Sequence, residues 1–320
     1  MLGEVTTLLV FVDGVGLGPL GAHNPFDGAP VEVLAPLAGR PGPVAWRGVD
    51  AALGHPGLPQ SASGQACLYT GKDAIAIAGG HRTGFPVGAL ARFVVAESIF
   101  AKARAAGLRA GFLNAFPRAR AEHVERVVRG EEPRPKHFYA SASTLAAVAG
   151  GGRLATLEDA FDGWAATFDL TGELAAAHGV DAPRRTPAGA ARAVLDGARA
   201  HDLALFELFL TDKAGHAQDT TWARHEIDRT ERFLAELLAR TRPDRELVVV
   251  TSDHGNLEDL STRSHTRADV PVLAWGRGSE AFLAGLGPRP DLATVGAAVL
   301  AHALEAWYRD DPNEAARSPR

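Results

Sequence analysis

The sequence predicts an α/β protein with a mostly parallel sheet, helices on both faces and a small inserted cap. Short apolar, β-branched runs alternate with longer helical patterns, which is the arrangement that a parallel sheet requires. Several of these runs end in acidic or imidazole side chains, at the position where open α/β sheets bind ligands. The length of 320 residues is sufficient for one large domain or two smaller ones.

The composition excludes several classes of protein. A formal net charge of -5 and the absence of a basic tract argue against nucleic acid as a partner. The single cysteine, Cys67, excludes an internal disulfide and fits a reducing compartment. The first residues lack the basic region of a signal peptide, and no apolar stretch is long enough to span a bilayer. We therefore expect a soluble, cytoplasmic protein with no membrane partner, whose oligomeric state stays open.

The N-terminal part begins with a predicted strand. Residues 7–12 are apolar and β-branched, and the run ends at Asp13. Residues 16–21 match G-x-G-x-x-G, but the prolines in and behind this stretch prevent the helix that a dinucleotide-binding fingerprint must open. We interpret it as a turn that lets the backbone pass close to a site. Residues 39–58, rich in Gly and Pro, are expected to be irregular.

A helix is predicted within residues 58–71. Pro59 and the hydroxyls of Ser61 and Ser63 are helix start signals. Gly71 provides the stop signal. The free N–H groups at a helix N-terminus attract anions, so a serine there could meet a phosphate. On this segment alone, an N-cap role for Ser61 is the simpler interpretation.

The middle of the chain changes in composition. A helical pattern over 92–106 and a strand over 108–113 precede a region of charge clusters, a Pro-rich step and a run of small residues. We predict that 115–200 is an inserted cap or lid, and that a helix opens at Thr186-Pro187 and runs to Ala200. The alternative is a peripheral subdomain without a role in binding.

A later strand carries a polar ending. Residues 203–211 form an apolar run that stops at Asp212, and His216 follows four residues later. Because Gly215 argues against a helix here, we expect a loop that folds both side chains onto one ion. A long amphipathic helix is predicted over 222–240.

The next strand repeats this plan. Residues 247–251 form a β-branched run, and Asp253 and His254 follow directly where the strand becomes a loop. His265 lies on the polar loop behind them, before a further strand over 270–275. An acid and an imidazole are thus placed again at the end of a buried strand.

The predicted elements divide the chain. A closing helix is expected over 291–307. Residues 1–114 and 201–310 then form the core, and 115–200 form the cap. The polar tail, 311–320, is expected to be flexible.

The polar groups that follow strands form a set: Asp13, Asp212, His216, Asp253, His254 and His265. Three carboxylates and three imidazoles suit Zn²⁺ or Mn²⁺, which accept mixed oxygen and nitrogen ligands. Each residue alone is equally well explained as a turn former or a surface histidine. Packing does not explain the whole set, however, so we predict a site for two divalent metal ions.

These residues also carry a resemblance to a known family. The chain resembles the alkaline phosphatase superfamily, and within it the metalloenzyme group that includes cofactor-independent phosphoglycerate mutase and phosphopentomutase. The resemblance rests on an ordered set: Asp13, Ser61, Asp212-x-x-x-His216, Asp253-His254-Gly255-Asn256 and His265-Thr266. It covers the segments 7–18, 58–71, 203–219 and 247–276. It implies an alkaline phosphatase-like core.

The stretch 61–71 also resembles the nucleophile motif of sulfatases and nucleotide phosphodiesterases. In those motifs the nucleophile lies ten residues before the closing glycine, and this register selects Ser61 over Ser63. A sulfatase is disfavoured because Arg is expected where Gln65 stands. The mutases carry His at the position of Gln65.

The resemblance implies ligands and a reaction. One metal is bound by Asp212, His216 and His265, and the other by Asp13, Asp253 and His254, with Ser61 completing its shell. The implied enzyme is a phosphatase, phosphodiesterase or small phosphomutase that forms a phosphoserine on Ser61 with a small phosphorylated substrate. Candidate substrate contacts are Lys213, Asn114 and Arg82. The alternatives are a phosphoglycerate mutase-like isomerase and a catalytically silent binding module of the same fold.

Overall fold

A computed structural model describes residues 5–310. Its strands are β1 (Thr6–Val12), β2 (Ala45–Val49), β3 (Ala110–Phe116), β4 (Leu154–Thr156), β5 (Leu203–Leu208), β6 (Glu246–Thr251) and β7 (Val270–Gly276). They form a seven-stranded sheet in the order β2-β7-β6-β1-β5-β3-β4. This sheet confirms the predicted α/β class. The predicted tail, 311–320, lies outside the described residues.

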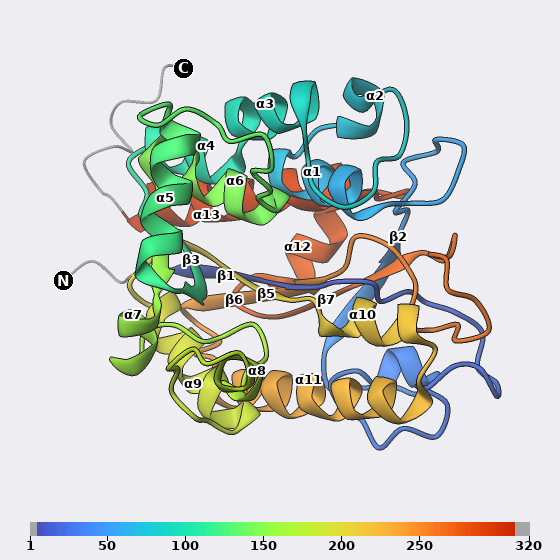
Figure 1. Cartoon of the computed structure of the whole chain (residues 1–320). Helices are drawn as coiled ribbons and strands as arrows, with labels where there is room; N and C mark the ends of the chain where they lie inside the picture. Colours follow the sequence, from blue (N-terminus) through green and yellow to red (C-terminus); the bar gives the residue numbers. More distant parts are fainter. Residues whose placement is uncertain (1–4, 311–320) are drawn as a thin grey trace.

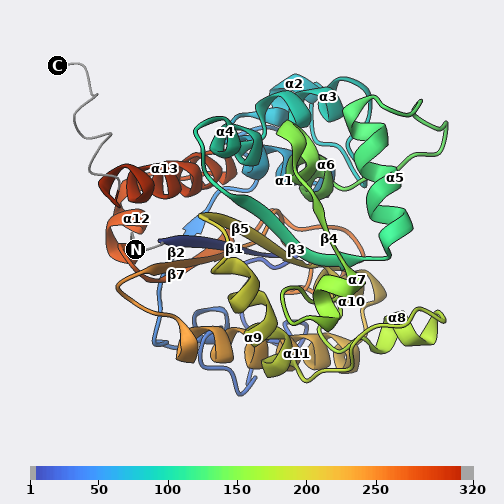
Figure 2. The ribbon, with the colours of Figure 1, turned by 90° about the vertical axis from the view of Figure 1, so that its left-hand side faces the viewer.

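Helices cover both faces of the sheet (Figure 1, Figure 2). The upper layer of Figure 1 holds α1 (Ser61–Thr70), α2 (Ala74–Ala78), α3 (Gly88–Glu97), α4 (Ile99–Ala105), α5 (Arg118–Arg129), α6 (Ala142–Val148), α12 (Ser279–Gly285) and α13 (Leu292–Asp310). The lower layer holds α7 (Leu157–Phe161), α8 (Glu173–Ala177), α9 (Pro187–Ala198), α10 (Leu210–Ala217) and α11 (Thr220–Arg240). A large apolar core fills the space on each face.

The centre of the sheet consists of parallel strands. β1 pairs with β5 on one side and with β6 on the other, and all three strands are buried along their whole length. Strands covered on both faces are expected to be near-continuous apolar runs, which explains the β-branched stretches of the sequence. β3 and β4 continue the parallel part beyond β5. β7 is antiparallel to β6, so the sheet is mixed at that edge.

Two local predictions are wrong. Residues 39–58 are not wholly irregular, because β2 forms an antiparallel edge strand on β7. Backbone hydrogen bonds hold this strand in the sheet. Its apolar side chain Trp46 is 44% exposed, so the strand lacks the alternation of buried apolar and exposed polar residues. The single helix predicted over 92–106 is broken at Ser98, whose hydroxyl caps α4 and donates to the Ala146 carbonyl.

The loop predicted from Asp212 to His216 is also wrong, and the strand predicted over 203–211 ends at Leu208. Residues 210–217 form helix α10, so Asp212 and His216 lie one turn apart on the same helix face. A glycine inside a helix costs only about 1 kcal/mol relative to Ala, which packing readily offsets. Gly215 is required for contact, since a Cβ there would lie 2.7 Å from Asn256 Cγ.

Parts of the segment 115–200 belong to the layers of the core. β4 extends the sheet beside β3, and α9, which Thr186 caps as predicted, packs against α11. α6 packs against α1 in the opposite layer. A cap role therefore stays a prediction only for the remaining part, which includes the loop 130–141. Among residues 5–310, none of the helices has the length and apolar character needed to cross a membrane.

Candidate metal centre

The candidate site lies where three neighbouring parallel strands end. Asp13 follows β1, α10 starts two residues after β5, and Asp253 comes two residues after β6. Because β5, β1 and β6 are adjacent and run in the same direction, their carboxyl ends meet at one edge of the sheet. The strand-end side chains thus converge through topology, although they are far apart in sequence.

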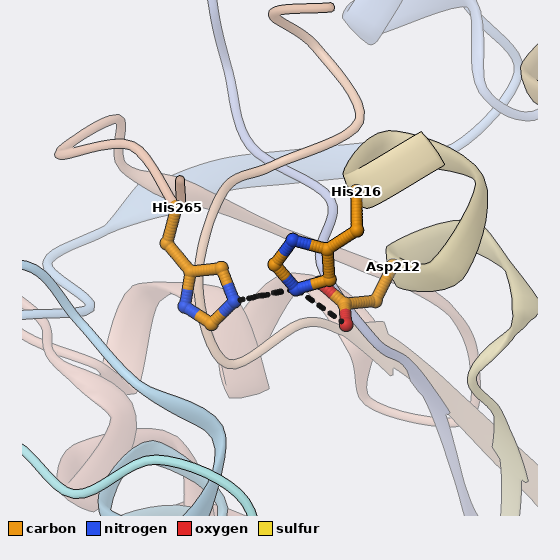
Figure 3. A group of neighbouring side chains, drawn as sticks. All are labelled: Asp212, His216 and His265. Carbon is orange, nitrogen blue, oxygen red and sulfur yellow. Dashed lines mark hydrogen bonds and ion pairs between the residues drawn. The ribbon is translucent and has the colours of Figure 1, made fainter. Parts of the chain in front are cut away.

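The first group of side chains is Asp212, His216 and His265 (Figure 3). His216 Nε2 lies 3.3 Å from Asp212 Oδ2 and 3.2 Å from His265 Nε2. His265 Nε2 lies 3.7 Å from Asp212 Oδ1. Two imidazole nitrogens and one carboxylate therefore face a common point.

The second group is Asp13, Asp253 and His254, and all three are buried. His254 Nε2 lies 3.4 Å from Asp13 Oδ1 and 3.5 Å from Asp253 Oδ2. The two groups adjoin, because the rings of His254 and His265 stack with centroids 3.6 Å apart. Three carboxylates and three imidazoles thus form one continuous cluster.

Ser61 lies at the edge of this cluster. It is the first residue of α1, and its Oγ lies 2.9 Å from His254 Nε2. The N-cap position belongs to Gln60, so the alternative of Ser61 as a mere N-cap is wrong. Ser63 lies two residues further along the same helix. Its hydroxyl instead donates to the Gln60 carbonyl and accepts from the Arg82 backbone amide.

The imidazoles are oriented by backbone carbonyls. Nδ1 of His216 lies 2.7 Å from the Arg263 carbonyl, and Nδ1 of His265 lies 3.0 Å from the Pro59 carbonyl. Nδ1 of His254 lies 3.3 Å from the Gly255 carbonyl. Since a carbonyl can only accept, each Nδ1 carries a proton, which leaves Nε2 as the atom that each ring offers to a metal ion.

This arrangement fits metal ions. The Nε2 atoms of His216 and His265 lie 3.2 Å apart, a separation at which both can bind the same cation. Asp13 Oδ1 is buried and has no hydrogen-bond partner, which is costly for a carboxylate unless a cation satisfies it. The mixed oxygen and nitrogen donors suit zinc or manganese.

The ionisation of the buried groups agrees with this fit. Burial, followed by the charge of Asp253, raises the pKa of Asp13 well above its usual value. Burial and the Asp212 charge raise the pKa of Asp253 to about 7. Burial and neighbouring His265 lower the pKa of His254 to about 3, so this ring is neutral at physiological pH. A bound cation favours the charged carboxylates and the neutral imidazoles.

Two further buried residues hold the candidate ligands in place. Asn256 Nδ2 donates to Asp212 Oδ1 at 2.7 Å. Glu258 accepts from the amides of Gly16 (2.9 Å) and Asn256 (2.8 Å), and from the Thr266 hydroxyl. Glu258 thereby ties the glycine-rich turn to the ligand loop. A Cβ at Gly16 would lie 2.5 Å from Glu258 Oε1, which explains the glycine there. Sequence reasoning missed Glu258, because an acid in a polar loop resembles a solvated one.

Replacing Glu258 by Ala is expected to lower the free energy of unfolding by about 3 kcal/mol. The change leaves two buried amides and a hydroxyl without an acceptor. Urea denaturation measures the loss. Glu280→Ala, at an exposed position of α12, is the matched control and should change stability by less than about 0.5 kcal/mol. Equal stability of Glu258→Ala and wild type would contradict this role.

Gln65 stands where the resemblance to the mutases implies His. Its Nε2 donates to Asp253 Oδ2 at 3.1 Å and to Asp13 Oδ2 at 3.4 Å. A neutral amide thus contacts two carboxylates of the second group. Gln65 therefore orients these carboxylates without adding a titratable group.

The candidate substrate contacts lie in different surroundings. Lys213 Nζ lies 5.3 Å from the centroid of the Phe209 ring, at the rim of a cleft. Asn114 lines the same cleft, but its amide is bonded to both backbone groups of Glu207. The Arg82 guanidinium donates to the Ala78 carbonyl and is not among the residues lining the cleft.

The cleft beside the cluster has a volume of ≈ 660 Å³. Its floor reaches Asp13, Ser61 and Asp212, and its walls carry many aromatic rings. Space of this size accommodates a small organic ligand. The arrangement places an accessible serine hydroxyl between a ligand pocket and six groups that could hold metal.

The family of the chain follows from comparison with known proteins. The family model of the metalloenzyme superfamily matches residues 5–305. The chain belongs to the metalloenzyme superfamily. The match includes both groups of candidate ligands and Ser61, and it confirms the family resemblance predicted from the motifs.

Curated relatives of this superfamily member match over short segments. Phosphopentomutase of Methylobacterium radiotolerans is 39% identical over 93 residues, which are 29% of this chain and 22% of that protein. Phosphopentomutase of Chromohalobacter salexigens is 42% identical over 76 residues, which are 24% of this chain and 16% of that protein. The chain therefore matches only about a fifth of the length of these relatives.

Solved structures share the fold over nearly the whole chain. The PH0037 protein from Pyrococcus horikoshii has a TM-score of 0.58 at 15% identity, covering 96% of this chain and 98% of that chain. Alkaline phosphatase from the Antarctic bacterium TAB5 has a TM-score of 0.52 at 15% identity, with coverage of 95% and 99%. The predicted alkaline phosphatase-like fold is thereby confirmed.

Proposed function

We propose that the chain is a two-metal-dependent phosphoryl-transfer enzyme that acts on a small phosphorylated substrate through Ser61. The observation that supports this most strongly is the position of the Ser61 hydroxyl, 2.9 Å from His254 Nε2 and at the floor of the cleft. A hydroxyl beside two groups of metal ligands is suited to nucleophilic catalysis. The single cysteine supports a cytoplasmic location as part of the same proposal.

Each residue has a role in this proposal. Asp212, His216 and His265 hold one ion, and Asp13, Asp253 and His254 hold the other, with manganese or zinc as candidates. When bound, such ions lower the pKa of a neighbouring hydroxyl and neutralise phosphoryl oxygens. The N-terminal amides of α1, next to Ser61, favour the negative charge of a phosphoryl group.

The reaction proceeds in two displacements. The Ser61 oxygen forms a bond to phosphorus while the bond between phosphorus and the leaving alcohol breaks, and the Ser61 proton leaves with that alcohol. Water, or another hydroxyl of the same substrate, then takes the phosphoryl group from the phosphoserine. Residues of the segment 115–200 that line the cleft, from Ala115 to Thr144, exclude bulk water during these steps.

A small phosphomutase is the second candidate. The matched segments of the phosphopentomutases favour it, because in a mutase the second acceptor is a hydroxyl of the substrate itself. Hydrolysis and mutase activity use the same phosphoserine on Ser61. They differ only in whether water or a substrate hydroxyl reaches it.

An assay with p-nitrophenyl phosphate and bis-p-nitrophenyl phosphate tests the proposal. The metal-free protein is supplied with Mn²⁺ or Zn²⁺, and the release of p-nitrophenol is followed. We expect metal-dependent turnover that stops when a chelator is added. No turnover with either ion would favour a catalytically silent binding module. The ratio of the two rates distinguishes a monoesterase from a diesterase.

A further inference from the structure

Glu207 is a buried acid that neither metal group uses. It lies in β5, where the other side chains are apolar, and only 7% of it is exposed. It lines the same cleft as Ser61 and Asp13. A carboxyl group in such a strand is costly to bury, so its presence requires a partner or a ligand.

A row of hydroxyl groups leads to this carboxyl. Ser143 Oγ donates to Glu207 Oε2 at 2.6 Å. Ser141 Oγ lies 2.7 Å from Ser143 Oγ and 2.8 Å from Thr144 Oγ1. Ser141 and Thr144 line the cleft beside Glu207.

The protons of this row all point toward the acid. With Glu207 ionised, Ser143 spends its only hydroxyl proton on the carboxylate, so Ser141 donates to Ser143 and Thr144 donates to Ser141. Thr144 Oγ1 therefore presents lone pairs. Among the described residues, no hydrogen bond reaches Glu207 Oε1 either. The cleft thus offers acceptors at both ends of the row.

Aromatic rings line the same cleft as these acceptors. Phe112 and Phe116 pack with centroids 6.0 Å apart, and Phe168 and Phe209 stack at 4.5 Å. All four rings line the cleft. A ligand there is held between apolar faces while its polar edge meets the acceptors.

The complement of this subsite is a group that donates hydrogen bonds. Two cations, Lys213 and Arg120, already line the cleft, so a neutral donor is favoured over an ammonium group. Burial raises the pKa of Glu207 to about 7, while the Ser143 hydrogen bond lowers it. A hydroxyl donated by a ligand would favour the ionised carboxylate further.

We propose that Glu207, with Ser141 and Thr144, binds the alcohol part of the substrate and selects phosphate esters whose alcohol carries further hydroxyl groups. This inference rests on the proposed function, since it assigns the leaving-group side of the same cleft. Glu207 is a specificity-determining residue here, and it takes no part in the bond changes at phosphorus.

The test compares two esters with the same carbon skeleton. Glycerol 2-phosphate carries two hydroxyls that isopropyl phosphate lacks, and p-nitrophenyl phosphate serves as the substrate without a donor. Wild type should prefer glycerol 2-phosphate to isopropyl phosphate by at least about tenfold in kcat/KM. The reason is that isopropyl phosphate leaves the buried acceptors of Glu207 and Thr144 without a hydrogen-bond donor. Glu207→Gln should bring this ratio close to one and change p-nitrophenyl phosphate turnover less than about threefold.

The matched control is Glu246→Gln. Glu246 is also a buried acid in a central strand, but it bonds Arg199 at the opposite end of the sheet. This variant should retain the wild-type preference. Thermal unfolding of both variants checks that they fold.

Each outcome is decisive. A wild type without preference, or a Glu207→Gln variant that keeps it, would overturn the inference. Ethanolamine phosphate supplies an ammonium group, and preference for it over glycerol 2-phosphate would contradict the assignment to hydroxyls. If no ester is hydrolysed, the proposed function fails instead. Calorimetric binding of the same two esters to metal-loaded wild type and Glu207→Gln then tests the subsite alone.

Discussion

Ser61→Ala is expected to lower kcat/KM for p-nitrophenyl phosphate by roughly 10³-fold or more, because the variant has no nucleophile. The side chain is only partly buried and contributes one hydrogen bond, to His254 Nε2. Thermal unfolding should therefore stay close to wild type. Rapid-quench detection of a phosphorylated protein, present in wild type and absent from the variant, measures the phosphoserine directly.

Ser63→Ala is the matched control for this prediction. Ser63 lies two residues along the same helix, and its buried hydroxyl bonds the Gln60 carbonyl and the Arg82 amide. Its loss should lower stability by about 1 kcal/mol and leave turnover within a few-fold of wild type. If Ser61→Ala retains wild-type turnover while Ser63→Ala loses it, the assignment of the nucleophile is wrong.

Asp212→Asn is expected to reduce bound metal from two ions per chain to one. The carboxylate faces both His216 and His265 with different oxygens, so a neutral amide removes the anionic member of that group. Replacement of groups that merely support ligands weakens metal binding by about 10–100-fold, and loss of a ligand should exceed this. Elemental analysis after dialysis measures the stoichiometry, and phosphatase turnover should fall in parallel.

Asp219→Asn provides the comparison. Asp219 is exposed and caps α11, a role that Asn fills almost equally well. This variant should keep both ions and full turnover. Two bound ions in Asp212→Asn would show that the first group of ligands has been assigned incorrectly.

The strands and the ligand cluster could be predicted because their signals are local. A buried parallel strand must be apolar, so β1, β5 and β6 stand out in the sequence. The carboxyl ends of such strands meet at one edge, so the sequence alone predicts that Asp13 and Asp253 lie together. The family motifs then identified Ser61 as the candidate nucleophile and divided the six candidate ligands into two groups.

The missed features depend on contacts between distant segments. Gly215 lies where α10 closely approaches Asn256. Helix propensity depends on the local sequence alone, so it does not reveal a contact with a distant segment. β2 is held by backbone pairing with β7, which needs no apolar pattern. Glu258 and Glu207 are single acids whose burial becomes apparent only in the folded chain. The apolar run around Glu207 was the one signal that could have indicated it.

Anomalous diffraction from crystals grown with Mn²⁺ or Zn²⁺ tests the two-metal centre most directly. We expect two peaks. One should lie among Asp212, His216 and His265, and the other among Asp13, Asp253 and His254 within reach of the Ser61 hydroxyl. Crystals with no peak in this cluster, or with metal bound only elsewhere on the chain, would contradict the account.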